Sequence, residues 1–294
     1  MVSYNGVKMT SATFLTNGPI EWASSRYRGY WIADCRPDWH AIHLKGQVEI
    51  PESDYYVIIK EAPLNLIEQL KGMSKRIYWD VCDPVHWFSP DAASAMALLV
   101  DGIVASNPAL AQDISGWSGV PTVCIPDRLD MEHYDRQRAH TDAEPIRYIW
   151  FGAAQNRSAL YGAYAILERL KASGYKIELT IMDDRPDMSL HYGPSCPVYM
   201  KRWTLQDEVE VLSNHDIALL PKYPGTWGQV KSNNKMLSAW ACGLPVDDAE
   251  DYRKSLDLAA VIDFRHNDSQ IGLDLVRDKY NIEQSAVEWE AIFS

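Results

Sequence analysis

The sequence predicts an α/β protein built from two Rossmann-like units. Strand-like and helix-like segments alternate through residue 125, and the same alternation restarts after a polar, charged stretch at residues 126–145. Repetition of this kind builds parallel sheets with helices on both faces. A length of 294 residues gives each unit enough chain for its own core. We therefore expect one domain over residues 1–130 and a second over residues 140–280.

In the first half, β-rich apolar runs alternate with segments of helical spacing. Residues 63–73 read as a helix because Leu64, Ile67 and Leu70 share one face and Gly72 stands near the end. Ser24 and Ser25 are suited to cap a helix that runs to about residue 32. We expect strands at residues 8–15, 54–59, 76–79, 102–105 and 122–125, and helices at residues 24–32, 63–73, 89–100 and 108–115.

The second half repeats the pattern. We expect strands at residues 146–151, 177–182, 198–200, 217–220 and 261–264, and helices at residues 157–172, 205–213 and 233–242. In such sheets ligands bind at the carboxyl ends of the strands, and with two units the crevice between them is the expected site.

The helix predicted at residues 233–242 is the most informative element. Ser232 is a suitable N-cap, and Gly243 with Pro245 marks the C-terminal stop. Lys231 and Lys235 flank the helix start, where the helix dipole is already positive. The free N–H groups of the first turn, the two lysines and the amides of residues 233 and 234 predict a phosphate or diphosphate site. A solvated helix start with chance lysines is the alternative. The Gly- and aromatic-rich loop at residues 221–229 favours the ligand.

Polar groups also follow other predicted strands. In the second half they are Gly152 with residues 156–157, the acidic pair at 183–184, and residues 199–203. In the first half the loops at residues 17–28 and 80–87 are candidates, and His86, Asp80 and Asp83 could serve in acid–base chemistry. A lone loop histidine is more often structural, and an ordinary turn remains the alternative at Gly152.

Composition excludes several classes of protein. The net charge of −12 gives no general attraction to nucleic acid or to an anionic membrane. The five cysteines are scattered without a C-x-x-C pair, so neither a disulfide framework nor a zinc site is indicated, and no other metal site has support. No apolar run approaches the roughly 18 residues that span a bilayer, and the N-terminus lacks a signal-peptide layout, so we expect a cytoplasmic protein.

The segment AWACGLPV at residues 239–246, which closes the key helix, resembles that of retaining, family-4-like glycosyltransferases of the GT-B fold. Further similarities are the Ser25–Arg28 segment, Trp203-Thr204 and the segment AVEWEAIF at residues 286–293. The resemblance implies two Rossmann-like domains facing a cleft, with a final helix, residues 281–294, that returns to the first domain. It further implies transfer of a sugar from a UDP- or GDP-type nucleotide sugar to an acceptor hydroxyl, with retention of configuration and without a metal or other cofactor.

The residue patterns described above, taken together with the resemblance, suggest roles for individual residues. The catalytic candidates are His86, Asp83 and Lys235. The donor-binding candidates are Gly152, Asn156, Arg157, Asp184, Trp203, Lys222, Trp227, Gly228, Gln229, Lys231, Ser232, Asn233, Asn234 and Lys235. The candidates on the acceptor side are Asn17, Gly18, Ser25, Arg26 and Arg28.

The sequence departs from the family at informative positions. Val230 and Ser238 stand where the family usually has two glutamates, and Asp247-Asp248 stands where small or apolar residues are usual. A sugar-nucleotide epimerase or hydrolase of the same fold, or a catalytically silent module that binds the nucleotide sugar, is therefore an alternative. The acceptor is not identified, and neither charge nor motif supports a nucleic acid.

Overall fold

The computed structural model describes residues 10–45, 49–188, 190, 192–223 and 225–294. It divides the chain into two compact units. Unit 1 comprises residues 1–130, 225–232 and 280–294, and unit 2 comprises residues 131–224 and 233–279. The short segment 225–232 thus belongs to unit 1 although residues of unit 2 precede and follow it. Among the described residues, no helix is both long and apolar enough to cross a membrane.

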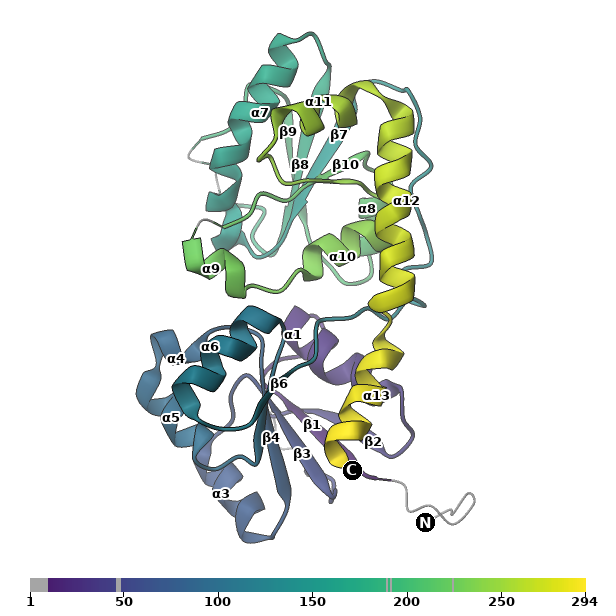
Figure 1. Cartoon of the computed structure of the whole chain (residues 1–294). Coiled ribbons are helices and arrows are strands. Elements are labelled where there is room, and N and C mark those ends of the chain that lie inside the picture. The colour runs from purple at the N-terminus through teal and green to yellow at the C-terminus, as the bar shows by residue number, and fades with distance from the viewer. Residues whose placement is uncertain (1–9, 46–48, 189, 191, 224) are drawn as a thin grey trace. The chain divides into compact units, whose positions relative to one another are not determined.

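Unit 1 contains a six-stranded parallel sheet in the order β2-β1-β3-β4-β5-β6 (Figure 1). The strands are β1 (Ala12–Thr16), β2 (Trp39–His43), β3 (Tyr55–Ile59), β4 (Arg76–Val81), β5 (Gly102–Ala105) and β6 (Thr122–Cys124). The helical elements are α1 (Ala23–Ser25), the π-helical turn η1 (Arg26–Tyr30), α2 (Trp31–Asp34), α3 (Leu64–Gly72), α4 (Val85–Phe88), α5 (Pro90–Ala97), α6 (Pro108–Ser118), α9 (Gly225–Val230) and α13 (Ile282–Phe293). The strand order reverses between β1 and β3.

Two faces of this sheet are covered by different parts of the chain. On one face, apolar residues of α3, α5 and α6, among them Ile67, Met96 and Ile114, form a single core with the strands. On the other face α13 supplies Trp289, which is fully buried and lies edge-on to Phe14 with ring centroids 5.7 Å apart. The C-terminal helix is therefore part of the core of unit 1.

Unit 2 contains a five-stranded parallel sheet in the order β11-β10-β7-β8-β9 (Figure 1). The strands are β7 (Ile146–Phe151), β8 (Ile177–Asp183), β9 (Val198–Arg202), β10 (Ile217–Leu219) and β11 (Val246–Asp247). The helical elements are the 3₁₀ turn η2 (Ala154–Ala159), α7 (Leu160–Ala172), α8 (Glu208–Ser213), α10 (Asn234–Ala241), α11 (Tyr252–Ala260) and α12 (Ile262–Lys279). The strand order reverses between β7 and β10, which makes this pair the topological switch point of the unit.

The prediction of a doubly wound α/β protein with two Rossmann-like units is confirmed by these two sheets. Individual elements differ from the sequence prediction. The segment 261–264, predicted as a strand, ends α11 and begins the 18-residue helix α12. A segment of four residues with three apolar side chains is too short for its pattern to separate a strand from a helix. Strands β2 and β11 were not predicted, and the first two residues of the strand predicted at 8–15 lie outside the described residues.

Helix starts were also predicted incorrectly. Asn233, not Ser232, is the N-cap of α10, and its side chain makes no capping hydrogen bond. Ser24 and Ser25 lie inside α1, whose N-cap is Trp22. Part of the loop predicted at 221–229 forms α9, and Pro224 lies outside the described residues. A cap depends on the backbone angles of one residue, which residue type influences only weakly.

Candidate functional site

The switch point of unit 2 is the candidate nucleotide site. Strand β7 runs into Gly152, and β10 is followed by Lys222 and Tyr223. Lys235, in the first turn of α10, lies over the rings of Trp150 and Tyr223, with its Nζ atom 5.6 Å and 5.7 Å from their centroids. The structure thus brings together Gly152 and Lys235, two residues that the sequence predicted for the donor side. A cation at a helix N-terminus beside exposed backbone suits a phosphate.

Gly152 leaves space for this lysine. Its φ angle is +153°, and a Cβ atom added there would lie 3.4 Å from Nζ of Lys235 and 3.5 Å from Trp150. The backbone conformation favours glycine, whereas these distances are those of ordinary van der Waals contact. The structure adds which side chain approaches Gly152, and its predicted contact with a ligand stays a prediction.

Replacing Gly152 by alanine is expected to weaken binding of a nucleoside diphosphate. A residue with a side chain is strained at this φ angle, at a cost of about 1–3 kcal/mol, so the affinity should fall several-fold. Calorimetric titration with UDP measures this. Gly162→Ala is the matched control, because nothing lies within 4 Å of the added methyl group there. Equal affinity of both variants for UDP would remove Gly152 from the site.

Two other donor-side candidates, Arg157 and Asp184, make contacts within unit 2. Arg157 makes a bidentate contact with buried Asp183 and also donates to the carbonyl oxygens of Arg185 and Met188. Asp184 accepts a hydrogen bond from the backbone N–H of Ala154 at 2.7 Å. These contacts fix the loops after β7 and β8. Because Arg157 is only 6% exposed, its side chain holds these loops in place and has little surface with which to contact a ligand.

Trp203 and Lys222 also contact other side chains of unit 2. The indole N–H of Trp203 donates to Glu208 at 3.0 Å. Lys222 is exposed and pairs with Asp248 at 3.3 Å and Glu250 at 3.1 Å, and its side-chain hydrogen bonds to these two carboxylates raise its pKa. Among the remaining candidates, Asn156, Asn233 and Asn234 lie in η2 or at the start of α10 and are half-buried.

Ser238, which stands where the family usually has a glutamate, is buried in a hydrogen-bond network. Its hydroxyl lies 2.8 Å from the hydroxyl of Tyr134, which in turn donates to Glu208 at 3.3 Å. The network joins α10 to α8. Ser238 is 1% exposed, so in this protein the position holds the helix in place.

Lys231 belongs to a different cluster from Lys235. It lies in unit 1, where its Nζ atom is 2.5 Å from Oδ1 of Asp83, and Nζ of Lys60 is 2.7 Å from Oδ2 of the same carboxylate. Burial acts to raise the pKa of Asp83, but the two ammonium groups outweigh it and lower that pKa below its usual value. Asp83 is therefore an ionised partner for lysines and a weak base. A role of Lys231 at the diphosphate stays a prediction and requires this ion pair to open.

Sequence reasoning missed Lys60. This residue follows β3 directly, at the switch point between β1 and β3, and has a φ angle of +66°. A residue other than glycine whose backbone lies in the left-handed region is uncommon, and such residues are often found at functional sites. The sequence offered no signal, because lysine in a loop usually reads as solvated surface.

His86 lies in α4 and is 6% exposed. Its Nε2 atom is 2.8 Å from Oδ2 of Asp113, and its ring stacks on Trp117 with centroids 4.9 Å apart. Its other ring nitrogen, Nδ1, is buried and has no hydrogen-bond partner among the described residues. The proposed general-base role of His86 stays a prediction, and it requires the ring to leave this pocket.

The acceptor-side candidates divide into two groups. Arg28 is fully buried and pairs with Asp80 and Asp127, and Arg26 donates to the carbonyl oxygens of Ile20 and Glu21. Both arginines therefore brace unit 1. Asn17 and Ser25 each place a side-chain oxygen in the interior with no hydrogen-bond partner in the described part of the chain. Gly18 packs against Trp22, and its carbonyl oxygen accepts a hydrogen bond from the hydroxyl of Thr16.

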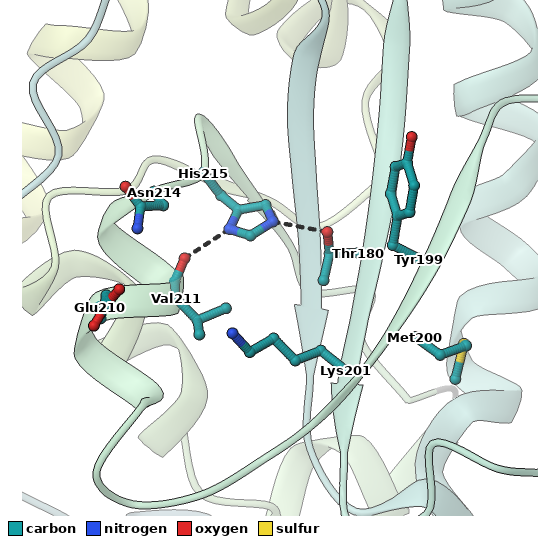
Figure 2. Close-up of a pocket in the computed structure, with 8 residues that line it drawn as sticks. All are labelled: Thr180, Tyr199, Met200, Lys201, Glu210, Val211, Asn214 and His215. Carbon is teal, nitrogen blue, oxygen red and sulfur yellow. Dashed lines mark hydrogen bonds between the residues drawn. The ribbon is translucent and has the colours of Figure 1, made fainter.

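A cavity of about 280 Å³ lies elsewhere in unit 2, between β8, β9 and α8 (Figure 2). Its lining residues are Thr180, Tyr199, Met200, Lys201, Glu210, Val211, Asn214 and His215. Three of them, Tyr199, Met200 and Lys201, belong to the stretch 199–203 that the sequence singled out, and the other five were not predicted. Thr180 lies in the middle of β8, away from the carboxyl ends of the strands. Within the described residues, no group of three or more His, Cys, Asp or Glu side chains could hold a metal ion.

His215 in this cavity gives unit 2 a dependence on pH. Its Nδ1–H donates to the carbonyl of Val211 at 2.7 Å, so Nε2 accepts from the hydroxyl of Thr180 at 2.8 Å (Figure 2). Burial lowers the pKa of His215, and burial likewise lowers the pKa of His140. Both rings are therefore held neutral in the folded state.

Unit 2 is expected to lose stability as the pH falls below about 6.5, the ordinary histidine pKa. The unfolded chain binds protons there that the folded unit does not, so the stabilisation is complete above pH 6.5 and shrinks as the pH approaches the lowered folded pKa. Thermal unfolding between pH 8 and pH 5 measures the effect. A His215→Gln variant should show a shallower decline, and an unchanged slope would contradict the assignment.

Comparisons with known proteins agree with this architecture. No protein-family model and no curated protein matches the chain. Among solved structures, an alpha-glucosyltransferase in complex with UDP and a 13-mer DNA superposes with a TM-score of 0.68 at 11% identity, covering 97% of this chain and 99% of that one. A putative UDP-N-acetylglucosamine 2-epimerase from Listeria monocytogenes gives a TM-score of 0.57 at 9% identity, covering 98% and 97%.

A third solved structure, a mutant of S. aureus TarM in complex with Fondaparinux, alpha-GlcNAc-glycerol and UDP, gives a TM-score of 0.55 at 13% identity. The match covers 82% of this chain and 55% of that one, so the present chain spans about half the length of TarM. At these identities the likeness shows the fold. The predicted GT-B fold, with two Rossmann-like units, is thereby confirmed.

Proposed function

We propose that this protein transfers a sugar from a UDP- or GDP-type nucleotide sugar to an acceptor hydroxyl. The observation that carries the proposal is the convergence of Gly152, Tyr223 and Lys235 on the switch point between β7 and β10. That is where a Rossmann-like unit binds a nucleotide. The UDP bound in the alpha-glucosyltransferase of similar fold supports the same donor class.

The chemistry needs positive charge at the leaving group. The bond between the sugar C1 atom and the diphosphate oxygen breaks, a bond from C1 to the acceptor oxygen forms, and the proton of the acceptor hydroxyl passes to the departing diphosphate. Lys235 and the backbone N–H groups at the start of α10 would stabilise the negative charge that develops on the diphosphate. We propose that this charge suffices without a divalent metal, and that the anomeric configuration is retained, as the resemblance to family-4-like enzymes implies.

The proposal is tested by incubating the protein with UDP- and GDP-sugars and measuring release of the nucleoside diphosphate. Release that depends on an added acceptor supports a transferase. Release or isomerisation without an acceptor indicates the hydrolase or epimerase, a class to which the Listeria structure of similar fold is assigned by name. Nucleotide binding without turnover across a broad acceptor panel indicates a silent module. The anomeric proton coupling of the product reports retention or inversion.

Activity is expected to survive an excess of EDTA. The physical reason is that an ammonium group and a helix N-terminus already offset the diphosphate charge. The measurement compares initial rates before and after chelation, with added magnesium or manganese as the restoring arm. Complete loss on chelation, reversed by either metal, would contradict metal independence.

The acceptor panel should include a nucleic acid. One structure of similar fold, an alpha-glucosyltransferase, was solved with DNA. Unmodified bases carry no aliphatic hydroxyl, so the DNA arm needs a duplex with a hydroxyalkylated base beside the unmodified duplex. The net charge of −12 weighs against a polyanionic acceptor, so this candidate is second.

A further inference from the structure

Unit 1 exposes a cluster of aromatic rings contributed by α4 and α9. Phe88 is 67% exposed and Trp87 is 39% exposed, whereas Trp227 of α9 is half-buried between them. The centroid of the Trp227 ring lies 5.4 Å from that of Phe88 and 6.3 Å from that of Trp87. We call Trp87, Phe88 and Trp227 the ring platform. Exposed rings that gather on one surface, rather than scattering singly, mark a binding site.

The ring platform adjoins a group of hydrogen-bonding charges. Nζ of Lys231 lies 4.5 Å from the centroid of the Trp227 ring, and the same ammonium pairs with Asp83, which Lys60 also contacts. The side chains of these three charged residues are between 23% and 29% exposed. Together they offer both donors and an acceptor beside apolar ring surface. A hydroxyl group, which donates and accepts, is matched by such a mixed set.

α9 is firmly held in this position. The side-chain amide of Asn107 donates to the carbonyl of Val230 at 2.6 Å, and Val230 is buried in the core of unit 1. Trp227 is therefore presented by a segment anchored on both its backbone and its apolar side. Pre-organised rings reduce the entropy that a ligand must overcome.

The charge of this region selects among ligands. Carboxylates occur in the segments next to the ring platform: Glu61 follows Lys60, Asp91 is the second residue of α5, and Asp113 contacts His86, the residue before Trp87. A strand of nucleic acid would meet repulsion from them. An uncharged ring with hydroxyl groups on its edge and C–H groups on its faces meets no such penalty.

We propose that the ring platform, with Lys60, Asp83 and Lys231, binds an uncharged sugar residue of the acceptor. This inference rests on the proposed function, because it names the class of acceptor for the glycosyl transfer proposed above. The sugar's C–H face would lie on the exposed ring of Phe88, and its hydroxyls would exchange hydrogen bonds with the charged group.

The test measures saccharide binding rather than turnover. The full chain is labelled with 5-fluorotryptophan, and the ¹⁹F resonances of Trp87 and Trp227 are assigned with Trp87→Phe and Trp227→Phe variants. Maltose, cellobiose and methyl glucosides are then titrated, with a 13-mer single-stranded oligonucleotide as the polyanion arm. We expect at least one neutral saccharide to shift both resonances. Phe88→Ala should weaken that binding about 3- to 10-fold.

Tyr192→Ala is the matched control, because Tyr192 is 74% exposed but lies in unit 2. It should leave saccharide binding unchanged. If no saccharide moves either resonance, or if only the oligonucleotide does, the inference is overturned. Binding of UDP or GDP, measured separately by calorimetry, distinguishes this failure from failure of the proposed function. Binding of UDP or GDP without saccharide binding overturns only the ring platform, and saccharide binding without binding of either nucleotide overturns only the transferase.

Discussion

Arg28→Met is expected to destabilise unit 1 by about 3–5 kcal/mol, because it leaves a buried carboxylate without its partner. The guanidinium of Arg28 contacts both oxygens of Asp80, at 2.8 Å and 2.7 Å, and donates to the carbonyl of Ile125 at 2.6 Å. Arg28 and Asp80 are both fully buried. Urea unfolding followed by circular dichroism gives the free energy of unfolding of the variant and of the parent.

Two further variants make this result specific. Arg36→Met removes an arginine whose ion pairs with Glu283 and Glu290 are partly exposed, and it should cost less than about 1 kcal/mol. The double variant Arg28→Met, Asp80→Leu removes both buried charges and should be more stable than Arg28→Met alone. If Arg28→Met were no worse than Arg36→Met, the pair would not hold the strand ends of unit 1 together.

Lys235→Met is expected to lower kcat/KM by about 10²- to 10³-fold, the usual effect of removing one group that stabilises charge in a transition state. Its ammonium lies over Trp150 and Tyr223, close to Gly152 and at the start of α10. The binding affinity should fall for UDP and not for uridine, because uridine carries no diphosphate. Steady-state kinetics and calorimetry with both ligands measure the two effects.

Lys222→Met is the control for this prediction. Lys222 follows β10 and is close to the same site in sequence, but its ammonium is exposed and paired with Asp248 and Glu250. It should change kcat/KM by no more than a few-fold. An equal loss in both variants would indicate a general effect of positive charge, and a larger loss for Lys222→Met would move the diphosphate site away from α10.

The sequence by itself determined the fold class and the helix at the centre of the candidate site. Residues 146–151 and 177–182 are mostly apolar runs of strand length, and such runs are typical of buried parallel strands. Gly243 and Pro245 end α10 through local backbone preferences. Lys235 could be chosen because a cation at a helix start is unfavourable without an anion. Each of these signals acts within a few residues.

The tertiary structure decided which polar side chains are available to a ligand. Arg28, Arg157 and Lys235 read alike in the sequence, as cations near strand ends or helix starts. Arg28 meets Asp80 and Arg157 meets Asp183, contacts between residues 52 and 26 positions apart, whereas Lys235 lies beside a glycine. Such pairings depend on strand order, and residue type does not encode strand order locally.

The same holds for Lys231 and Lys60. Lys231 and Lys235 are four positions apart, so the sequence analysis placed them in one site. In the structure α9 and Lys231 belong to unit 1, and Lys231 forms an ion pair with Asp83. Lys60 carried no sequence signal and meets that carboxylate only because β3 and β4 are neighbours in the sheet. Local propensity defined the elements of this protein, and long-range packing chose their charged partners, because an ion pair forms between whichever groups the folded backbone brings together.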